Sequence, residues 1–331
     1  MNRHIKKITV FLFLIAICFS LSGVKNAEAA EAVTYRLKWL FNASVIGDIY
    51  ADVHGHFKTQ GLDVTVKEGG PERDAIRELE LGYAQFGVAS ADQVIRALAK
   101  GSPVVVIAQL FQVNPLQWIY RTETHDIKGV EDLKGKIVGI TFGGNDETIM
   151  RTLMAKSGVT EKDLSFFSVR YDYTPFYQKR VDVWPVYRNS QAPMLEKKLG
   201  DMGEAVAYLN PAAHGVKFVA NSVVTSRRLM ESQPDVVEKF VKALLQGWED
   251  ALDPNKEEQA LKTLRQFDKD TAADIMRMQL VITRSLIKPF KDTRIGTIDI
   301  KAWQQTETIM LEQKQISSPV LVEKVIRAPF H

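Results

Sequence analysis

The chain has 331 residues, of which 45% are hydrophobic and 25% charged, and its formal net charge at pH 7 is +3. This length suffices for two lobes of ordinary size, each with its own core. The one cysteine excludes a disulfide within the chain and a metal site built from several thiolates.

The N-terminus has the organisation of a secretory signal peptide. Basic residues within the first seven positions precede an apolar run over residues 8–24, and Ala27 and Ala29 stand where signal peptidase reads small residues. The alternative is a retained membrane anchor, for which the run is short. Cys18 follows Ile17, which is not a small residue, so lipidation is not expected. We expect cleavage near Ala29 and a periplasmic protein.

The charge balance of the mature chain is close to neutral. Cleavage near Ala29 removes four Lys or Arg residues and one Glu, which leaves 39 residues of each sign and no cysteine. A nucleic-acid binder needs a basic footprint, and none remains after this processing. The composition therefore argues against a nucleic-acid partner.

Strand-like and helix-like segments alternate along the chain from Thr34 onward, which is typical of a mostly parallel α/β sheet. Residues 216–224 precede a change of character, and helical patterns dominate from Pro234 to about Gln315. The predicted strands comprise residues 35–39, 62–66, 86–89, 103–110, 136–140, 164–169 and 181–184.

The order of these elements predicts two α/β units joined by extended segments and followed by a helical tail. Ligands of open parallel sheets bind beyond the carboxyl ends of the strands, where loops meet helix N-termini. Four loops fall at such ends: residues 39–48, 69–70, 90–92 and 143–147. We expect them to converge if the two sheets face each other across a cleft.

Several motifs resemble one branch of the periplasmic substrate-binding proteins of ABC importers, which takes up thiamine pyrimidine precursors, alkanesulfonates and related small molecules. Their order and spacing carry the resemblance, which runs from about residue 34 to 290. The matching positions are Trp39, Asn42, Gly47, Ala51, Gly55, Phe57, and the runs 61–64, 82–88, 101–105, 132–139 and 234–243.

The resemblance implies a two-lobed periplasmic-binding-protein fold of type II, with two hinge crossovers near residues 112–121 and 218–225 and a helical C-terminal tail. We expect one lobe to comprise residues 30–116 and 221–331, and the other residues 117–220. Closure about the hinge would present the loaded form to an ABC permease at the inner membrane. A monomer without a cofactor is expected.

Aromatic side chains suggest how a ligand is held. Trp184 and Tyr187 lie in a stretch that also carries Asn189, and Trp39 or Phe41 would supply an opposing face. Aromatic pairs contribute about 0.5–1.5 kcal/mol beyond area burial, so a flat ring suits such a site. The alternative is that Trp184 and Tyr187 pack the core of the second lobe.

Acidic residues in the predicted loops bear on the charge of the ligand. Asp48, Asp92 and the pair Asp146 and Glu147 stand at the strand ends. A carboxylate would repel an anion by about 4 kcal/mol at roughly 4 Å in an intermediate dielectric. This favours a neutral or amino-bearing ring, although acidic residues also begin helices merely to complement the helix dipole.

We therefore expect a solute receptor, not an enzyme, that binds a small flat heterocycle such as a thiamine pyrimidine precursor. The alternatives are a flavin receptor, a receptor for an alkanesulfonate or nitrate, and, more remotely, a relative of the fungal pyrimidine synthase. That synthase uses pyridoxal phosphate and carries a cysteine-rich motif, which this chain lacks. No metal site is expected, since His54 and His56 have no further ligand nearby in sequence. The candidate ligand-binding residues are Trp39, Asn42, Asp48, Gly70, Ser90, Asp92, Gly144, Asn145, Tyr171, Trp184, Tyr187 and Asn189.

Overall fold

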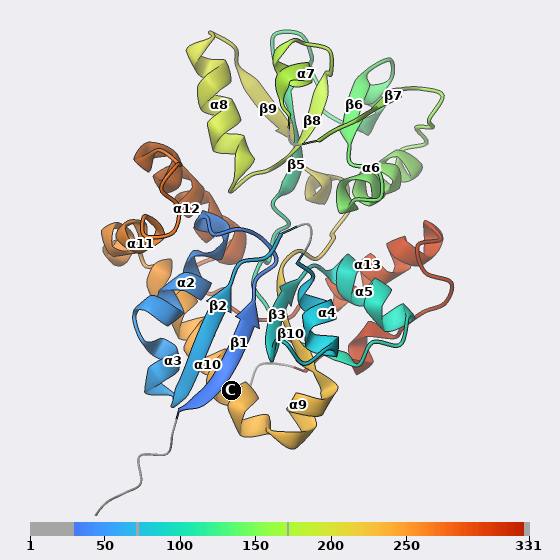
Figure 1. The fold of residues 1–331 in the computed structure, drawn as a ribbon. Helices are drawn as coiled ribbons and strands as arrows, with labels where there is room; N and C mark the ends of the chain where they lie inside the picture. Colours follow the sequence, from blue (N-terminus) through green and yellow to red (C-terminus); the bar gives the residue numbers. More distant parts are fainter. Residues whose placement is uncertain (1–29, 71–72, 171, 328–331) are drawn as a thin grey trace, which may run out of the picture.

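The protein folds into two lobes, each built on a five-stranded sheet (Figure 1). The computed structural model describes residues 30–70, 73–170 and 172–327. The strand order is β2-β1-β3-β10-β4 in the first lobe and β7-β6-β8-β5-β9 in the second. Each predicted strand overlaps an observed one, although the strand predicted at residues 35–39 begins earlier and forms β1 over residues 31–36.

The elements of the first lobe come from both ends of the described chain. Its strands are β1 (Glu31–Arg36), β2 (Leu62–Lys67), β3 (Phe86–Ala89), β4 (Val104–Gln109) and β10 (Ser222–Ser226). Its N-terminal helices are η1 (Ala43–Val45), α2 (Ile46–Val53), α3 (His56–Thr59), α4 (Ala75–Glu80) and α5 (Ala91–Ala99). The helices after β10 are α9 (Arg227–Ser232), α10 (Pro234–Ala251), η4 (Pro254–Lys256), α11 (Glu257–Leu264), α12 (Ala273–Ile287), α13 (Ile300–Glu312) and η5 (Val322–Lys324).

The second lobe is one continuous stretch of chain. Its strands are β5 (Leu116–Arg121), β6 (Ile137–Ile140), β7 (Ser165–Ser168), β8 (Val183–Tyr187) and β9 (Val206–Leu209). Its helices are η2 (Val130–Leu133), α6 (Asn145–Lys156), α7 (Thr174–Tyr177), α8 (Gln191–Asp201) and η3 (Pro211–His214).

Strand pairing shows how the chain passes between the lobes. In the first sheet β1 runs parallel to β2 and β3, whereas β10 runs antiparallel to β3 and β4. Because β10 follows the entire second lobe, the chain leaves the first sheet over residues 110–115 and returns over residues 215–221. This confirms the predicted α/β fold with two crossovers and a helical C-terminal region. The exact lobe limits stay predictions.

Long helix α10 covers one face of the first sheet. Pro234 begins this helix, and its missing N–H costs no hydrogen bond because an N–H at the first position has no acceptor within the helix. The Phe240 ring stacks on Phe86 of β3 with centroids 3.7 Å apart. A Cβ added to Gly47 of α2 would lie 2.0 Å from the Trp248 ring, so a glycine is required where α2 meets α10. These contacts make the first lobe a packed support for the ends of its strands.

Two further buried clusters connect and complete the lobes. One cluster extends from β3 and α5 of the first lobe through Trp303 of α13 to α6 of the second. The other lies inside the second lobe around Trp184 and Phe176. Within the described residues, no helix is long and apolar enough to cross a membrane. The predicted signal peptide lies outside the described residues.

Candidate ligand-binding site

The ends of β1 and β2 lie against each other in the first lobe. The Gly69 N–H donates to the Trp39 carbonyl oxygen at 2.9 Å. A Cβ on Gly69 would come within 2.2 Å of the Leu37 carbonyl oxygen, so only glycine permits this approach. Trp39 itself is half-buried, and Gly70 has a φ of 148°, which favours glycine. Both predicted residues therefore lie at the expected strand ends.

Asn42 and Ser90 act as helix caps at neighbouring strand ends. The Asn42 side-chain oxygen accepts from the Ser44 N–H at 2.8 Å and begins η1. Ser90 begins α5, and its N–H donates to the Gln93 side chain at 3.1 Å. Their positions match the prediction, and their capping contacts explain why these residue types occur there.

Asp48 lies inside the first lobe and not at its edge. Its side chain is 1% exposed, and its Oδ1 accepts from the Tyr35 hydroxyl at 2.7 Å and from Trp248 Nε1 at 3.3 Å. Burial raises the pKa of Asp48 to about 7, against the opposing effect of those hydrogen bonds. The expectation that Asp48 faces a ligand is corrected: it occupies a polar position within the core.

In the second lobe, α6 begins beside the end of β8. Gly144 is the N-cap of α6, and its N–H donates to the Thr141 carbonyl oxygen at 2.8 Å. The Asn145 side chain donates to the Tyr187 hydroxyl at 3.3 Å. The structure thus brings together three predicted residues, two of which offer polar groups on half-buried side chains.

Trp184 packs the interior of the second lobe. It is 1% exposed, and its ring contacts those of Phe167, Tyr173 and Phe176 at centroid distances of 6.3, 6.0 and 6.0 Å. Trp184 therefore packs the core of the second lobe and not a ligand, because β8 is covered on both faces and this side chain belongs to the buried cluster around Phe176. Tyr171 lies outside the described residues.

Asn189 belongs to a contact between the second lobe and α12. Its side chain is 1% exposed and donates to the Thr283 hydroxyl at 3.1 Å. Beside it, the Gln279 amide of α12 donates to the Ser190 carbonyl oxygen at 2.8 Å. Sequence reasoning missed Gln279 and Thr283, since nothing local marks a helical residue whose partner lies about ninety positions away.

A second link between the lobes involves Gln315, which follows α13. Its amide group donates to the Thr148 hydroxyl of α6, and its side-chain oxygen accepts from Arg96 of α5 at 3.1 Å. Arg96 also pairs with Asp92, which is 3% exposed. Asp92, a predicted ligand residue, is thus engaged in an ion pair with Arg96 one helical turn further along α5.

The remaining acidic residues of the loops are also engaged within the protein. Asp146 is 5% exposed and accepts from the Thr141 N–H at 2.6 Å. Glu147 accepts from the Gly143 N–H at 2.7 Å and pairs with Arg151 at 2.8 Å. Since these loop carboxylates are paired within the protein, they do not repel an anionic ligand as free carboxylates would, and the expectation of a neutral or amino-bearing ring loses this support.

Lys38 was missed by the sequence reasoning. It immediately precedes Trp39 at the end of β1 and is half-buried. Burial lowers the pKa of Lys38, whereas the nearby Asp92 raises it and Arg96 lowers it further. The available signal was a lysine next to Trp39, just beyond the first strand.

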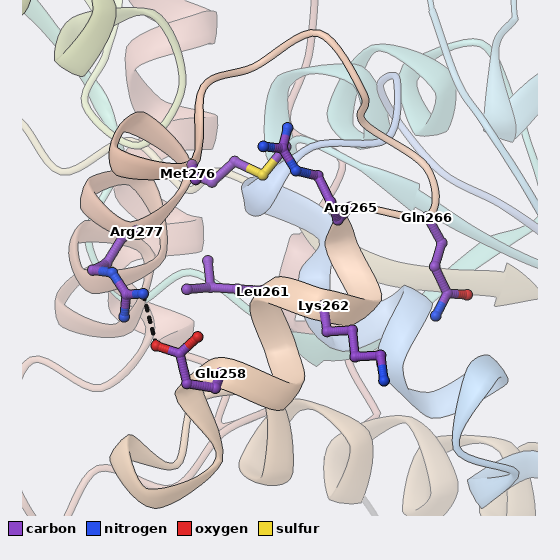
Figure 2. Close-up of a pocket in the computed structure, with 8 residues that line it drawn as sticks. Glu258, Leu261, Lys262, Arg265, Gln266, Met276 and Arg277 are labelled. Carbon is purple, nitrogen blue, oxygen red and sulfur yellow. Dashed lines mark hydrogen bonds and ion pairs between the residues drawn. The ribbon is translucent and has the colours of Figure 1, made fainter.

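Two cavities lie outside the set of predicted residues. One, of about 420 Å³, is an open groove between α11 and α12, where Glu258 pairs with Arg277 (Figure 2). The other, of about 310 Å³, lies beside the crossovers, with Asn114 and Phe218 among its lining residues. The second cavity contacts both lobes on the hinge side of the molecule.

The two sheets, the double crossover and the paired strand ends define a two-lobed binding-protein architecture. The chain belongs to the NMT1/THI5-like family, whose sequence profile matches residues 42–258, more than half of the chain.

Named relatives align over most of their length. The chain is 24% identical to a formylaminopyrimidine-binding protein of Halalkalibacterium halodurans, over 96% of this chain and 97% of that protein. It is 25% identical to the riboflavin-binding protein RibY of Chloroflexus aurantiacus, over 92% and 88%. It is 23% identical to a 4-amino-5-hydroxymethyl-2-methylpyrimidine phosphate synthase of Legionella pneumophila, over 81% and 82%.

Solved structures share the fold. The alkanesulfonate-binding protein SsuA of Xanthomonas axonopodis pv. citri superposes with a TM-score of 0.67 at 17% identity, covering 91% of this chain and all of that one. The Candida albicans CA3427 gene product, described as having the generic periplasmic binding protein fold, superposes with a TM-score of 0.61 at 15% identity, over 89% and 96%. The periplasmic-binding-protein fold is thus established for this chain.

Proposed function

We propose that this protein is the solute receptor of an ABC importer and that it binds an aminopyrimidine of the thiamine-precursor type between its lobes. The observation that carries the proposal is the pairing of Asn145 with Tyr187 at the end of β8, on a two-lobed fold whose lobes contact each other through α12 and α13. Similarity to a formylaminopyrimidine-binding protein over 96% of the chain supports the ligand class.

The proposed ligand face combines rings with directional polar groups. Trp39 contributes an aromatic surface from the first lobe, and Tyr187 contributes one from the second. The Asn145 amide offers both a donor and an acceptor, which suits the ring nitrogen and amino group of a pyrimidine. Asn42 and Gly70 complete the wall of the first lobe. The flat ring of the ligand would stack between the two aromatic side chains, and the amide groups would set its orientation through hydrogen bonds.

Transport, not turnover, is the proposed role. One relative is a synthase, but the cysteine-rich motif of the fungal enzyme has no counterpart in a chain whose one cysteine is Cys18. The signal-peptide pattern of residues 1–29 supports export to the periplasm. There the protein would act as a monomer and deliver its ligand to a permease in the inner membrane.

The cross-lobe contacts suggest how loading is reported. Asn189 and Thr283 are joined on one side of the molecule, and Gln315 joins Arg96 to Thr148 on the other. Each link depends on the distance between the lobes, so closure over a ligand would favour these links and opening would break them. A permease would then distinguish the two forms by their shape.

A thermal-unfolding screen of residues 30–331 tests the ligand class. A ligand at a hundred times its dissociation constant adds about 2.7 kcal/mol to the free energy of unfolding. Formylaminopyrimidine and 4-amino-5-hydroxymethyl-2-methylpyrimidine should raise the melting temperature, whereas taurine and nitrate should not. The reverse pattern refutes the aminopyrimidine proposal, and a shift with riboflavin alone favours the flavin receptor. Conversion of a ligand into a new product indicates an enzyme.

Matched aromatic variants test the site. Trp39→Ala should weaken aminopyrimidine binding by about tenfold, as expected for loss of one stacked ring. Tyr83→Ala is the control, because that side chain is 67% exposed in the turn after α4 and lies outside the proposed face. Equal affinities of the Trp39→Ala variant and the wild type, measured by calorimetry, contradict the stacking role.

A further inference from the structure

Lys38 places a positive charge at the face proposed to hold the ligand. Lys38 lies in the bend two residues beyond β1, and it is half-buried between the core residue Leu37 and the half-buried Trp39. Its charged neighbours are Asp92 in the first turn of α5 and Arg96 in the last turn of that helix. It directly precedes Trp39, so the ammonium group and the proposed stacking ring come from the same strand end.

Asp92 is too engaged to neutralise both cations. One of its carboxylate oxygens accepts from the Ser90 hydroxyl at 2.5 Å, and the other pairs with Arg96. Lys38 forms no ion pair with any carboxylate of the residues that the structure describes. With Lys38 and Arg96 protonated and Asp92 ionised, the three side chains together carry a net charge of +1.

The two cations differ in their freedom to meet a ligand. Arg96 is fixed between Asp92 and the Gln315 side chain, and Gln315 in turn contacts Thr148 of the second lobe. Lys38 has a flexible stem and three donors. A half-buried ammonium group with no acceptor loses hydration energy that an acceptor on the ligand would restore.

We propose that Lys38 binds the ligand directly and that the ligand carries an anionic oxygen group, such as a phosphate ester, beside its flat ring. This inference rests on the proposed function. A lysine acts on such a group as a compact point charge. The ring would lie on Trp39 while the anion reaches the neighbouring Lys38. The preferred cargo is thus the phosphorylated form of the heterocycle, and the neutral ring binds more weakly.

The test compares ligands that differ only in this group. Two pairs are suitable: 4-amino-5-hydroxymethyl-2-methylpyrimidine with its phosphate ester, and riboflavin with riboflavin phosphate. Calorimetric titration of residues 30–331 should show that the ester of the preferred ring binds at least about tenfold more tightly than its neutral partner. Inorganic phosphate alone should compete weakly.

Variants assign that preference to Lys38. Lys38→Met should remove the advantage of the ester, so that the ester and the neutral ring bind with equal affinity, whereas Lys38→Arg should keep part of the advantage. Lys67→Met is the matched control, because Lys67 ends the adjacent strand β2, is exposed, and is in register with Arg36. Thermal unfolding without ligand reports whether each variant is folded.

The outcomes separate this inference from the proposed function. Equal binding of ester and neutral ring by the wild type overturns the inference and leaves the receptor proposal standing. An ester preference that persists in Lys38→Met, or competition by inorganic phosphate as strong as by the ester, also overturns it. If neither pair binds and formylaminopyrimidine does not bind either, the heterocycle receptor itself is refuted.

Discussion

The buried carboxyl group of Asp48 makes the stability of the first lobe depend on pH. Asp48 is 1% exposed and accepts hydrogen bonds from Tyr35 and Trp248, yet burial raises its pKa to about 7. The ordinary value in an unfolded chain is about 3.9. A difference of about three pH units corresponds to about 4 kcal/mol of linked stability.

The sign follows from proton binding. Between about pH 4 and pH 7 the folded protein keeps the Asp48 proton while the unfolded chain has released it. The free energy of unfolding contributed by this group is therefore fully present below the unfolded pKa and is lost as the pH rises to about 7. About 2 kcal/mol of that loss falls between about pH 5.5 and pH 8.

Substitution by asparagine isolates this effect. Asp48→Asn keeps an oxygen that can accept from Tyr35 and Trp248 but carries no titrating group. Urea unfolding of residues 30–331 should show that the wild type loses about 2 kcal/mol relative to Asp48→Asn between about pH 5.5 and pH 8. Asp63→Asn, on an exposed position of β2, is the control and should follow the wild type. Parallel pH profiles of the wild type and Asp48→Asn would refute the reasoning.

Further substitutions test the packing and the lobe contacts. Trp184→Ala should lower the free energy of unfolding by about 3–5 kcal/mol, since a fully buried ring is lost; an unchanged urea midpoint would contradict its core position. Gly69→Ala should destabilise by about 1–3 kcal/mol because the new Cβ would lie 2.2 Å from a backbone oxygen. In contrast, Gly200→Ala in helix α8 meets nothing within 4 Å and should stabilise by up to about 1 kcal/mol, so equal effects of the two changes would be inconsistent with this packing. Asn189→Ala should cost about 0.5–1.5 kcal/mol through loss of its bond to Thr283, and a double-mutant cycle with Thr283→Val that gives strictly additive losses would show that the pair does not interact.

Local pattern predicted most of the fold but only part of the site. The alternation of strand and helix signals located elements such as β3 and α10, because turns and apolar periodicity depend on neighbouring residues. The same patterns located Gly70, Ser90, Gly144 and Asn145 at strand ends, since caps and tight turns restrict residue type. Side-chain direction within those loops was not accessible in this way.

The buried positions illustrate the limit. Trp184 stands in a strand that is covered on both faces, so alternation cannot tell which side meets a ligand. Whether an acidic loop residue is free to meet a ligand depends on its partner in the folded protein, as Arg96 is for Asp92. A charge counted in sequence is therefore not a charge presented to a ligand.

By itself, the sequence determined the order of strands and helices, and with it a two-lobed α/β fold whose loops gather at strand ends. Only the tertiary structure decided which of those loop residues face outward. Asp48 is buried by Trp248, 200 positions along the chain, and Lys38 acquires its charged neighbours from a different element. Burial and charge pairing are set by segments that meet only on folding, and for that reason no local pattern reveals them.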